Sequence, residues 1–186
     1  VTSSYRSSFF QDQGVGLASV RAGNVIGGGD WADNRLIPDI LRSFEKSETV
    51  VIRNPGATRP WQHVLEPLSG YLILAEKLYK NQKEYAEGWN FGPNEQDVKS
   101  VDWIVNEMTL KWPNSGWRLD SNYNPYEAVF LKLDILKSKS RLEWQPVWGL
   151  NYTLEKIVNW HRAWINEEDI QAVCLAEIKE YTRSMK

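Results

Sequence analysis

The chain has 186 residues, a mass of 21.6 kDa and a net charge of −2, with 25% charged and 42% hydrophobic residues. This balance is typical of a globular protein with a buried core. It excludes wholesale disorder and a broad nucleic-acid-binding surface, which needs an excess of Lys and Arg. The single cysteine, Cys174, excludes a disulfide framework and indicates a reducing, cytoplasmic compartment, and the longest apolar run, from Tyr71 to Ala75, is too short to span a membrane.

Hydrophobic periodicity and turn residues predict strands that alternate with helices, which is the pattern of an α/β protein. In chain order the first half predicts the end of a helix over 1–13, a strand over 15–24, a glycine loop over 27–30, a helix over 36–46, a strand over 50–52, a turn-rich loop over 54–60 and a helix over 65–80. The second half predicts a strand over 89–91, a helix over 100–111, a strand over 117–119 and helices over 134–141, 150–166 and 168–183.

Several common site motifs are absent from the sequence. A dinucleotide fingerprint needs glycines that open a helix directly after a strand, but the expected helix begins at Leu36, well after the glycines of 23–29. The sequence has no phosphate-binding P-loop, no nucleophile elbow and no H-E-x-x-H motif. Its two histidines, His63 and His161, are far apart and lack companion ligands, so no metal site is expected.

Four blocks together resemble the nucleotide-sugar-modifying branch of the extended short-chain dehydrogenases. These blocks are RAGNVIGGGD at 21–30, RLIPDI at 35–40, VIRNPGATRPWQHVL at 51–65 and EGWNFGP at 87–93. The long R-P-W-Q-H-V run is the most specific, and it is most similar to dehydratases that act on a CDP-sugar. The resemblance implies the C-terminal part of that α/β fold, with the end of the NAD-binding Rossmann domain over 1–30 and a substrate-binding lobe over 31–186.

The resemblance also implies an N-terminal half that this sequence lacks. In the family that half contains the glycine fingerprint that holds NAD and a catalytic Y-x-x-x-K, and Val1 falls just after the expected position of the Tyr and Lys. We therefore expect no catalytic residue here and no turnover by the chain alone. The full-length protein is expected to be a homo-oligomer, and the incomplete first helix is expected to leave this chain prone to association.

Two arginines are candidates for holding the diphosphate of the substrate. A planar guanidinium donates paired, directional hydrogen bonds to phosphate oxygens. Arg59 matches the phosphate-binding arginine of the family, and Arg53, six residues earlier, is placed to reach the base or the ribose. Asn24 and Asn90 match family residues that contact the sugar and phosphate region. The alternatives are a surface or ion-paired role for Arg59 and turn capping by Asn24.

The resemblance assigns the remaining candidates to the nucleotide base and the cofactor. Arg35, Leu36 and Ile37 match the segment that contacts the base, although Leu36 could equally pack in the helix core. Glu127 replaces a basic run of the thymidine-linked relatives, and its carboxylate could accept the exocyclic amine of cytosine. Ala22 would lie near the nicotinamide of NAD, with strand packing as its alternative.

Two other functions stay open on the sequence alone. The chain could come from another epimerase or dehydratase of the same branch, with a different nucleotide. Alternatively, its 10 tryptophans could form platforms for sugars in a carbohydrate-binding protein without enzymatic activity. Nucleotide preference separates the first alternative from a CDP-sugar enzyme, and tight binding of a free glycan would support the second.

Overall fold

The computed structural model describes residues 1–10, 13–121 and 129–185 and confirms the predicted α/β class. The strands are β1 (Ser19–Ala22), β2 (Asn24–Ile26), β3 (Val50–Ile52), β4 (Thr58–His63), β5 (Gly88–Phe91), β6 (Val98–Ser100) and β7 (Trp117–Leu119). The helices are α1 (Thr2–Tyr5), the π-helix η1 (Arg6–Phe10), α2 (Leu36–Glu45), α3 (Leu65–Lys80), α4 (Gln82–Tyr85), the 3-10 helix η3 (Glu95–Asp97), α5 (Val101–Lys111), α6 (Leu136–Leu142), α7 (Leu150–Ile165) and α8 (Ile170–Ser184).

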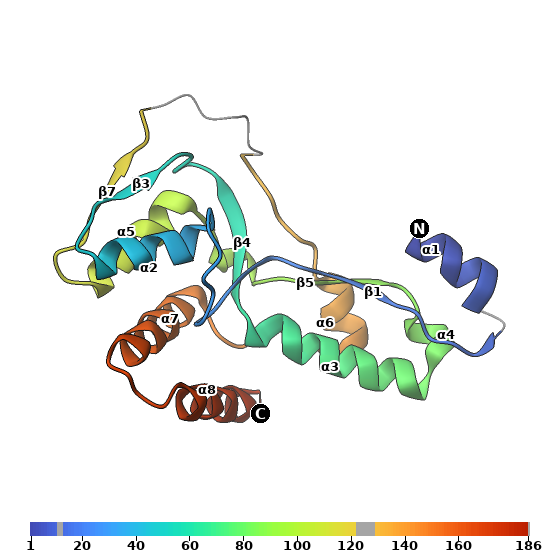
Figure 1. The fold of residues 1–186 in the computed structure, drawn as a ribbon. Coiled ribbons are helices and arrows are strands. Elements are labelled where there is room, and N and C mark those ends of the chain that lie inside the picture. Colours follow the sequence, from blue (N-terminus) through green and yellow to red (C-terminus); the bar gives the residue numbers. More distant parts are fainter. Residues whose placement is uncertain (11–12, 122–128, 186) are drawn as a thin grey trace.

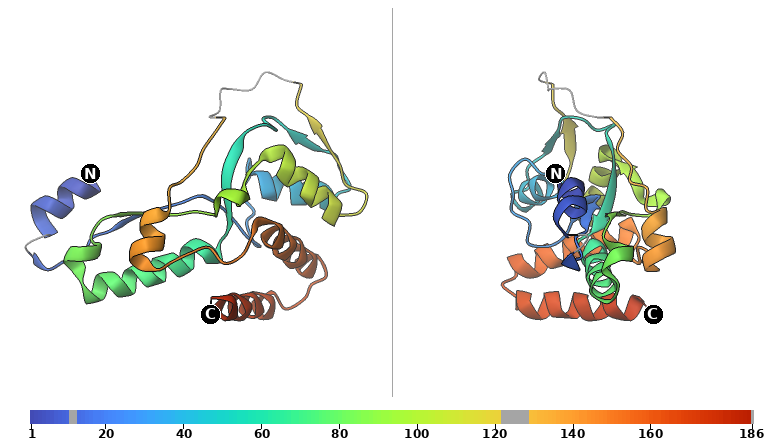
Figure 2. Two further views of the ribbon diagram at one scale, coloured as in Figure 1. Left: turned by 180° about the vertical axis from the view of Figure 1, so that it is seen from behind. Right: turned by 90° about the vertical axis from the view of Figure 1, so that its right-hand side faces the viewer.

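The strands form three small sheets rather than one. β1 pairs with β5 and β3 pairs with β7, both in parallel, while β4 pairs in parallel with β2 and antiparallel with β6. In Figure 1, β1, β5, α3 and α6 extend toward one end of the molecule and α2, β3, α5 and β7 gather at the other, with β4 between them. The view from behind in Figure 2 shows the same division, with α7 and α8 beneath β4.

Two apolar clusters follow this division. One joins α2, β3, α5 and α7, and its fully buried members include Ile40, Ile104 and Leu154. The other lies between α3, β5 and α6 around Phe91 and Trp144. The first cluster supports the end of the molecule where the candidate site lies. Most of its residues recur at three- or four-residue steps, so the amphipathic pattern predicts the extents of α2 and α7 to within about one residue.

The predicted strand over 15–24 is interrupted at Gly23. A side chain there would place its Cβ 2.3 Å from the carbonyl oxygen of Pro60, so only glycine fits where β2 leaves β1 to join β4. The Gly23 N–H and the Gln62 side-chain amide both donate to the carbonyl oxygen of Phe91, at 3.0 and 2.9 Å. These contacts join the β1–β5 sheet to the β2–β4–β6 sheet. Asn24 therefore begins a new strand instead of ending the first one.

The predicted loop over 54–60 is wrong in its second half, because β4 begins at Thr58. Proline is disfavoured inside a sheet because it cannot donate to a neighbouring strand. Pro60 is accommodated because β4 changes partner there: residues 58–60 pair with β6, and residues 61–63 pair with β2. The six-residue strand therefore places Arg59 within regular structure, where its backbone is held on the β6 side.

Polar side chains precede two of the helices and make hydrogen bonds there. The Asp134 carboxylate accepts the backbone N–H of Leu136, although α6 itself begins at Leu136 rather than at residue 134. Ser100 precedes α5, and its hydroxyl donates to Asp102 rather than capping the helix. None of the described helices is both long enough and apolar enough to cross a bilayer.

His63 gives the fold a pH-dependent stability. Its ring is 2% exposed, accepts the backbone N–H of Leu65 at 3.3 Å and packs against Trp148 at 4.9 Å between ring centroids. Burial, assisted by the charge of Lys156, lowers the pKa of His63 from 6.5 to about 4. The unfolded chain therefore binds the additional proton between these values, and stability is lost as the pH falls through that window.

We expect acidification from pH 6.5 to 4 to cost about 3 kcal/mol of unfolding free energy through His63, at about 1.36 kcal/mol for each pKa unit. Urea unfolding across this range measures the slope. The variant His63→Asn should show a shallower slope. A residual slope is expected because burial also lowers the pKa of His161. An unchanged slope in this variant would contradict the assignment.

Candidate functional site

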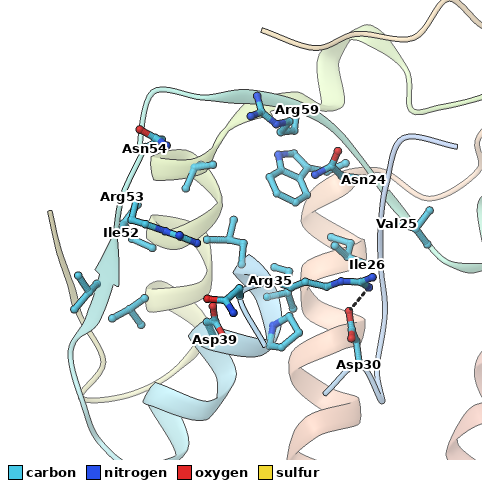
Figure 3. Close-up of a pocket in the computed structure, with 18 of the residues that line it drawn as sticks. Asn24, Val25, Ile26, Asp30, Arg35, Asp39, Ile52, Arg53, Asn54 and Arg59 are labelled. Atoms are coloured by element: carbon cyan, nitrogen blue, oxygen red, sulfur yellow. Dashed lines mark hydrogen bonds and ion pairs between the residues drawn. The ribbon is translucent and has the colours of Figure 1, made fainter. Parts of the chain in front are cut away.

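A pocket of about 490 Å³ opens where four elements meet: the start of β2, the start of α2, the end of β3 and the first half of β4. Ligand pockets of small molecules commonly measure about 300–1,000 Å³. Figure 3 shows side chains from all four elements directed toward this space. Six of the predicted site residues line it: Asn24, Arg35, Leu36, Ile37, Arg53 and Arg59.

Arg59 and Trp61 form the β4 wall of the pocket. They are two residues apart in a strand, so their side chains share one face of the sheet. Arg59 is 8% exposed and donates to the carbonyl oxygen of Thr58 at 3.0 Å, and Trp61 donates its indole N–H to the carbonyl oxygen of Lys99 at 2.9 Å. Asn24 is the register partner of Trp61 across the parallel β2–β4 pair. Strand pairing therefore brings Asn24 beside the arginine.

The start of α2 forms a second wall. Arg35 precedes the helix and makes no capping hydrogen bond with its side chain, so no Arg35 group covers the first backbone N–H groups. A helix N-terminus presents N–H groups and a positive dipole end, which suit an anion when other cations lie nearby. The Arg35 guanidinium pairs with Asp30 at 3.1 Å, with 65% and 29% of the two side chains exposed. Such an exposed pair is weak and can yield to a phosphate.

The β3 wall contributes Arg53. This exposed side chain follows β3 directly, and Figure 3 shows its guanidinium reaching toward the middle of the pocket. Val50, Val51 and Ile52 also line the pocket, and Val50 and Ile52 belong to the core at the same time. The two predicted guanidiniums of Arg53 and Arg59 thus reach one cavity from different strands, as a diphosphate ligand would require.

Trp61 and Asp39 are two of the lining residues that were not anticipated from the sequence. Trp61 was missed because the segment up to residue 60 was predicted as a loop, and a strand prediction would have placed it on the face of Arg59. Asp39 lies in the first turn of α2 and lines the pocket, where the sequence offers only the general preference for acidic residues near helix starts. Arg42 binds Asp39 and also Asp33, the latter at 3.2 Å.

Two predicted site residues, Asn90 and Ala22, are not among the described residues that line the pocket. The Asn90 side chain donates to the carbonyl oxygen of Asp134 at 3.0 Å, on the β5 side of the molecule. Ala22 pairs with Phe91 in the β1–β5 sheet, one residue before the pocket begins at Gly23. Glu127 lies outside the described residues. The expected gathering of two guanidiniums and two carboxamides therefore includes Asn24 but not Asn90.

The glycine loop between β2 and α2 does not fit a dinucleotide. A Cβ at Gly28 would lie 2.2 Å from the indole ring of Trp160. The buried Trp160 side chain therefore occupies the space beside this glycine that a pyrophosphate would need. The loop then continues to Trp31, which packs at 6.2 Å from Trp160 and 4.5 Å from Trp164 between ring centroids. No helix starts at the glycines, since α2 begins at Leu36. The described residues thus provide no cradle for NAD in this loop.

The spacing Y-x-x-x-K occurs within α7 but without the chemistry of a catalytic pair. Tyr152 and Lys156 both donate to the Glu180 carboxylate, the lysine at 2.6 Å. The Glu180 hydrogen bond, followed by burial, raises the pKa of Tyr152, whereas a tyrosine that acts as a base near neutral pH needs a lowered pKa. Neither residue lines the pocket between β2, α2, β3 and β4.

The tryptophans serve mainly to pack the interior. Trp61, Trp89, Trp144, Trp148 and Trp160 are buried, while Trp31 and Trp164 are 44% and 41% exposed. These two exposed rings contact each other at an interplanar angle of 51°, so they do not form a flat platform for a sugar. Among residues 1–10, 13–121 and 129–185, no group of three metal-ligating side chains is assembled.

A curated protein matches almost the whole of this chain. No family model matches the sequence. The chain is 54% identical to CDP-glucose 4,6-dehydratase of Salmonella typhimurium strain LT2, over 97% of this chain and 52% of that protein. The chain thus spans about half the length of this curated relative.

Solved structures match the fold. A UDP-glucose-4-epimerase from Stenotrophomonas maltophila superposes with a TM-score of 0.71 at 16% identity, over 84% of this chain and 51% of that chain. The dTDP-glucose 4,6-dehydratase of Bacillus anthracis, in complex with NAD, gives a TM-score of 0.65 at 16% identity, over 87% of this chain and 47% of that chain. These matches confirm the predicted α/β fold, which this chain shares with about half of each of these two proteins.

Proposed function

Since this chain is a homologue of CDP-glucose 4,6-dehydratase and has the fold of part of an extended short-chain dehydrogenase, we propose that it binds the CDP-sugar substrate of such an enzyme. The pocket between β2, α2, β3 and β4 is the binding site. Its support is the convergence of Arg53 and Arg59 on one cavity beside Asn24 and the start of α2. Each group suits one part of a nucleoside diphosphate sugar.

The diphosphate is assigned to the arginines. Phosphate oxygens accept charge-assisted hydrogen bonds from guanidiniums, and Arg59 is oriented by the strand that carries it. Asn24 offers both a donor and an acceptor to the sugar and the phosphate next to it. The apolar side chains of Leu36, Ile37 and Val51 line the same cavity and provide contact surface for a pyrimidine ring.

The chemistry of the complete enzyme is a separate part of the proposal. The full-length protein would convert CDP-glucose to a 4-keto-6-deoxy sugar with loss of water, as an NAD-dependent homo-oligomer in the cytoplasm. NAD would be bound mainly by residues outside this chain, because the glycine loop here is occupied by Trp160. The 186-residue chain alone is therefore expected to bind the substrate without converting it.

Calorimetric titration of the chain with CDP, UDP and dTDP tests the proposal. We expect CDP to bind about tenfold more tightly than UDP or dTDP, a ratio within the usual range for reading one base by hydrogen bonds. A preference for UDP or dTDP would assign the chain to another enzyme of the branch. Binding of a free glycan without binding of any nucleotide would overturn the proposal. Steady turnover of CDP-glucose by the chain would overturn the expectation that it binds the substrate without converting it.

A further inference from the structure

We infer that Asp39 selects cytosine over uracil in this pocket, an inference that rests on the proposed binding of a CDP-sugar. The two bases differ at N3, which accepts in cytosine and donates in uracil, and at position 4, where cytosine presents an amino group that donates and uracil presents a carbonyl oxygen that accepts. A carboxylate is an acceptor only. It attracts the amino group of cytosine and repels the carbonyl oxygen of uracil, so a carboxylate at this position favours CDP.

Two carboxylates from the described residues line the pocket, and of these Asp39 has an oxygen that no described residue contacts. Asp30 uses both oxygens, since Oδ1 accepts the N–H of Ala32 at 3.1 Å and Oδ2 accepts the guanidinium of Arg35 at 3.1 Å. Asp39 accepts Arg42 through Oδ1. Oδ2 of Asp39 makes no hydrogen bond or ion pair with another described residue, and 42% of the Asp39 side chain is exposed.

Arg42 orients the Asp39 carboxylate through an ion pair. Its guanidinium donates to the Trp31 carbonyl oxygen at 3.0 Å and contacts Asp33 at 3.2 Å as well as Asp39. It is therefore anchored at several points and fixes the carboxylate it binds. A fixed acceptor discriminates better than a mobile one, because it cannot turn away from an unfavourable partner.

The position of Asp39 suits the base rather than the phosphates. Asp39 is on α2, one turn from Leu36 and Ile37, and α2 packs against β3. In Figure 3, Arg59 lies at one end of the pocket and Asp39 at the other, with the Arg53 guanidinium between them. A nucleotide with its diphosphate at Arg59 therefore extends its base toward Asp39, past Arg53.

Titration of the whole chain with CDP and UDP tests the inference through the ratio of the two dissociation constants. We expect Asp39→Asn to reduce the preference for CDP by about tenfold, because an amide can donate to the carbonyl oxygen of uracil. Asp39→Ser, which has no carboxylate, should reduce the preference as well. Asp33→Asn is the matched control: it removes another carboxylate from Arg42, but Asp33 is not a pocket residue, so the ratio should stay unchanged.

The outcomes separate the two proposals. If the unaltered chain binds neither nucleotide, the proposed function and this inference both fail. If it prefers CDP and both Asp39 variants keep that preference, the inference fails and the proposed function stands. Loss of the preference in Glu127→Gln, with retention in Asp39→Asn, also overturns the inference and places the selecting residue at position 127.

Discussion

Replacing Arg59 by alanine is expected to weaken CDP binding by about a hundredfold, which corresponds to about 2.7 kcal/mol. A charge-assisted hydrogen bond contributes about 1.5–3 kcal/mol, and a guanidinium can make two of them to one phosphate. Arg59 is 8% exposed and lies on a strand paired on one side to β6, so it reaches the pocket without ordering a mobile segment. Calorimetric titration with CDP at constant ionic strength measures the loss.

Two companion variants identify the source of this effect. Arg59→Lys keeps the charge but loses the paired geometry, so a smaller loss of about tenfold is expected. Arg118→Ala removes an exposed arginine of β7 that does not line the pocket, and CDP affinity should not change. If Arg59→Ala binds CDP as tightly as the unaltered chain at an unchanged melting temperature, Arg59 does not hold the diphosphate.

Replacing Glu66 by alanine should produce the largest loss of stability, roughly 4 kcal/mol of unfolding free energy, because it leaves buried donors without an acceptor. Glu66 is fully buried on α3. Its carboxylate accepts the backbone N–H of Trp148 at 2.7 Å, that of Val147 at 3.0 Å and the Tyr181 hydroxyl at 2.7 Å. One side chain thus joins α3 to the segment before α7 and to α8.

Thermal unfolding measures this effect, and a decrease of about 10 °C in melting temperature is expected for a chain of this size. Glu155→Ala, an exposed glutamate on α7, is the matched control and should melt close to the unaltered chain. Equal melting of Glu66→Ala and the control would show that the three donors find other acceptors.

The Glu66 carboxyl also makes the free energy of unfolding depend on pH. Burial, opposed by the hydrogen bonds from Trp148, Tyr181 and Val147, raises the pKa of Glu66 above 4.5. The folded state therefore holds this proton more strongly than the unfolded state, and its contribution to stability decreases as the pH rises above 4.5. Glu66→Gln does not titrate, so the stability of the unaltered chain relative to this variant should fall over the same pH range.

Local patterns predicted most of the fold because they act within one or two turns of chain. The apolar spacing of α2 and α7 specifies which face is buried, and the short apolar run of β3 is bounded by turn residues. The errors fell where a remote segment decides the structure. β1 and β2 separate at Gly23 because Pro60 approaches it, and β4 is a strand because β2 and β6 pair with it.

The candidate site shows the same limit. The residue types and the family motif singled out Asn24, Arg53 and Arg59, but no local rule states that they line one cavity or that Asn90 faces elsewhere. The glycines after β2 read as loop residues, and their contact with Trp160, more than a hundred positions later, becomes visible only in the folded chain. Which oxygen of Asp39 stays without a described partner depends on where Arg42 is anchored.

Composition, short-range periodicity and a contiguous motif were enough to predict the α/β class, the resemblance to CDP-glucose 4,6-dehydratase and the chemical types of the candidate binding residues. The folded chain was needed to show which candidate residues line one pocket, that Trp160 packs against Gly28, and that one oxygen of Asp39 has no described partner. The physical reason is that strand pairing and side-chain packing join segments far apart in the chain, and the free energy of each such contact depends on both partners together.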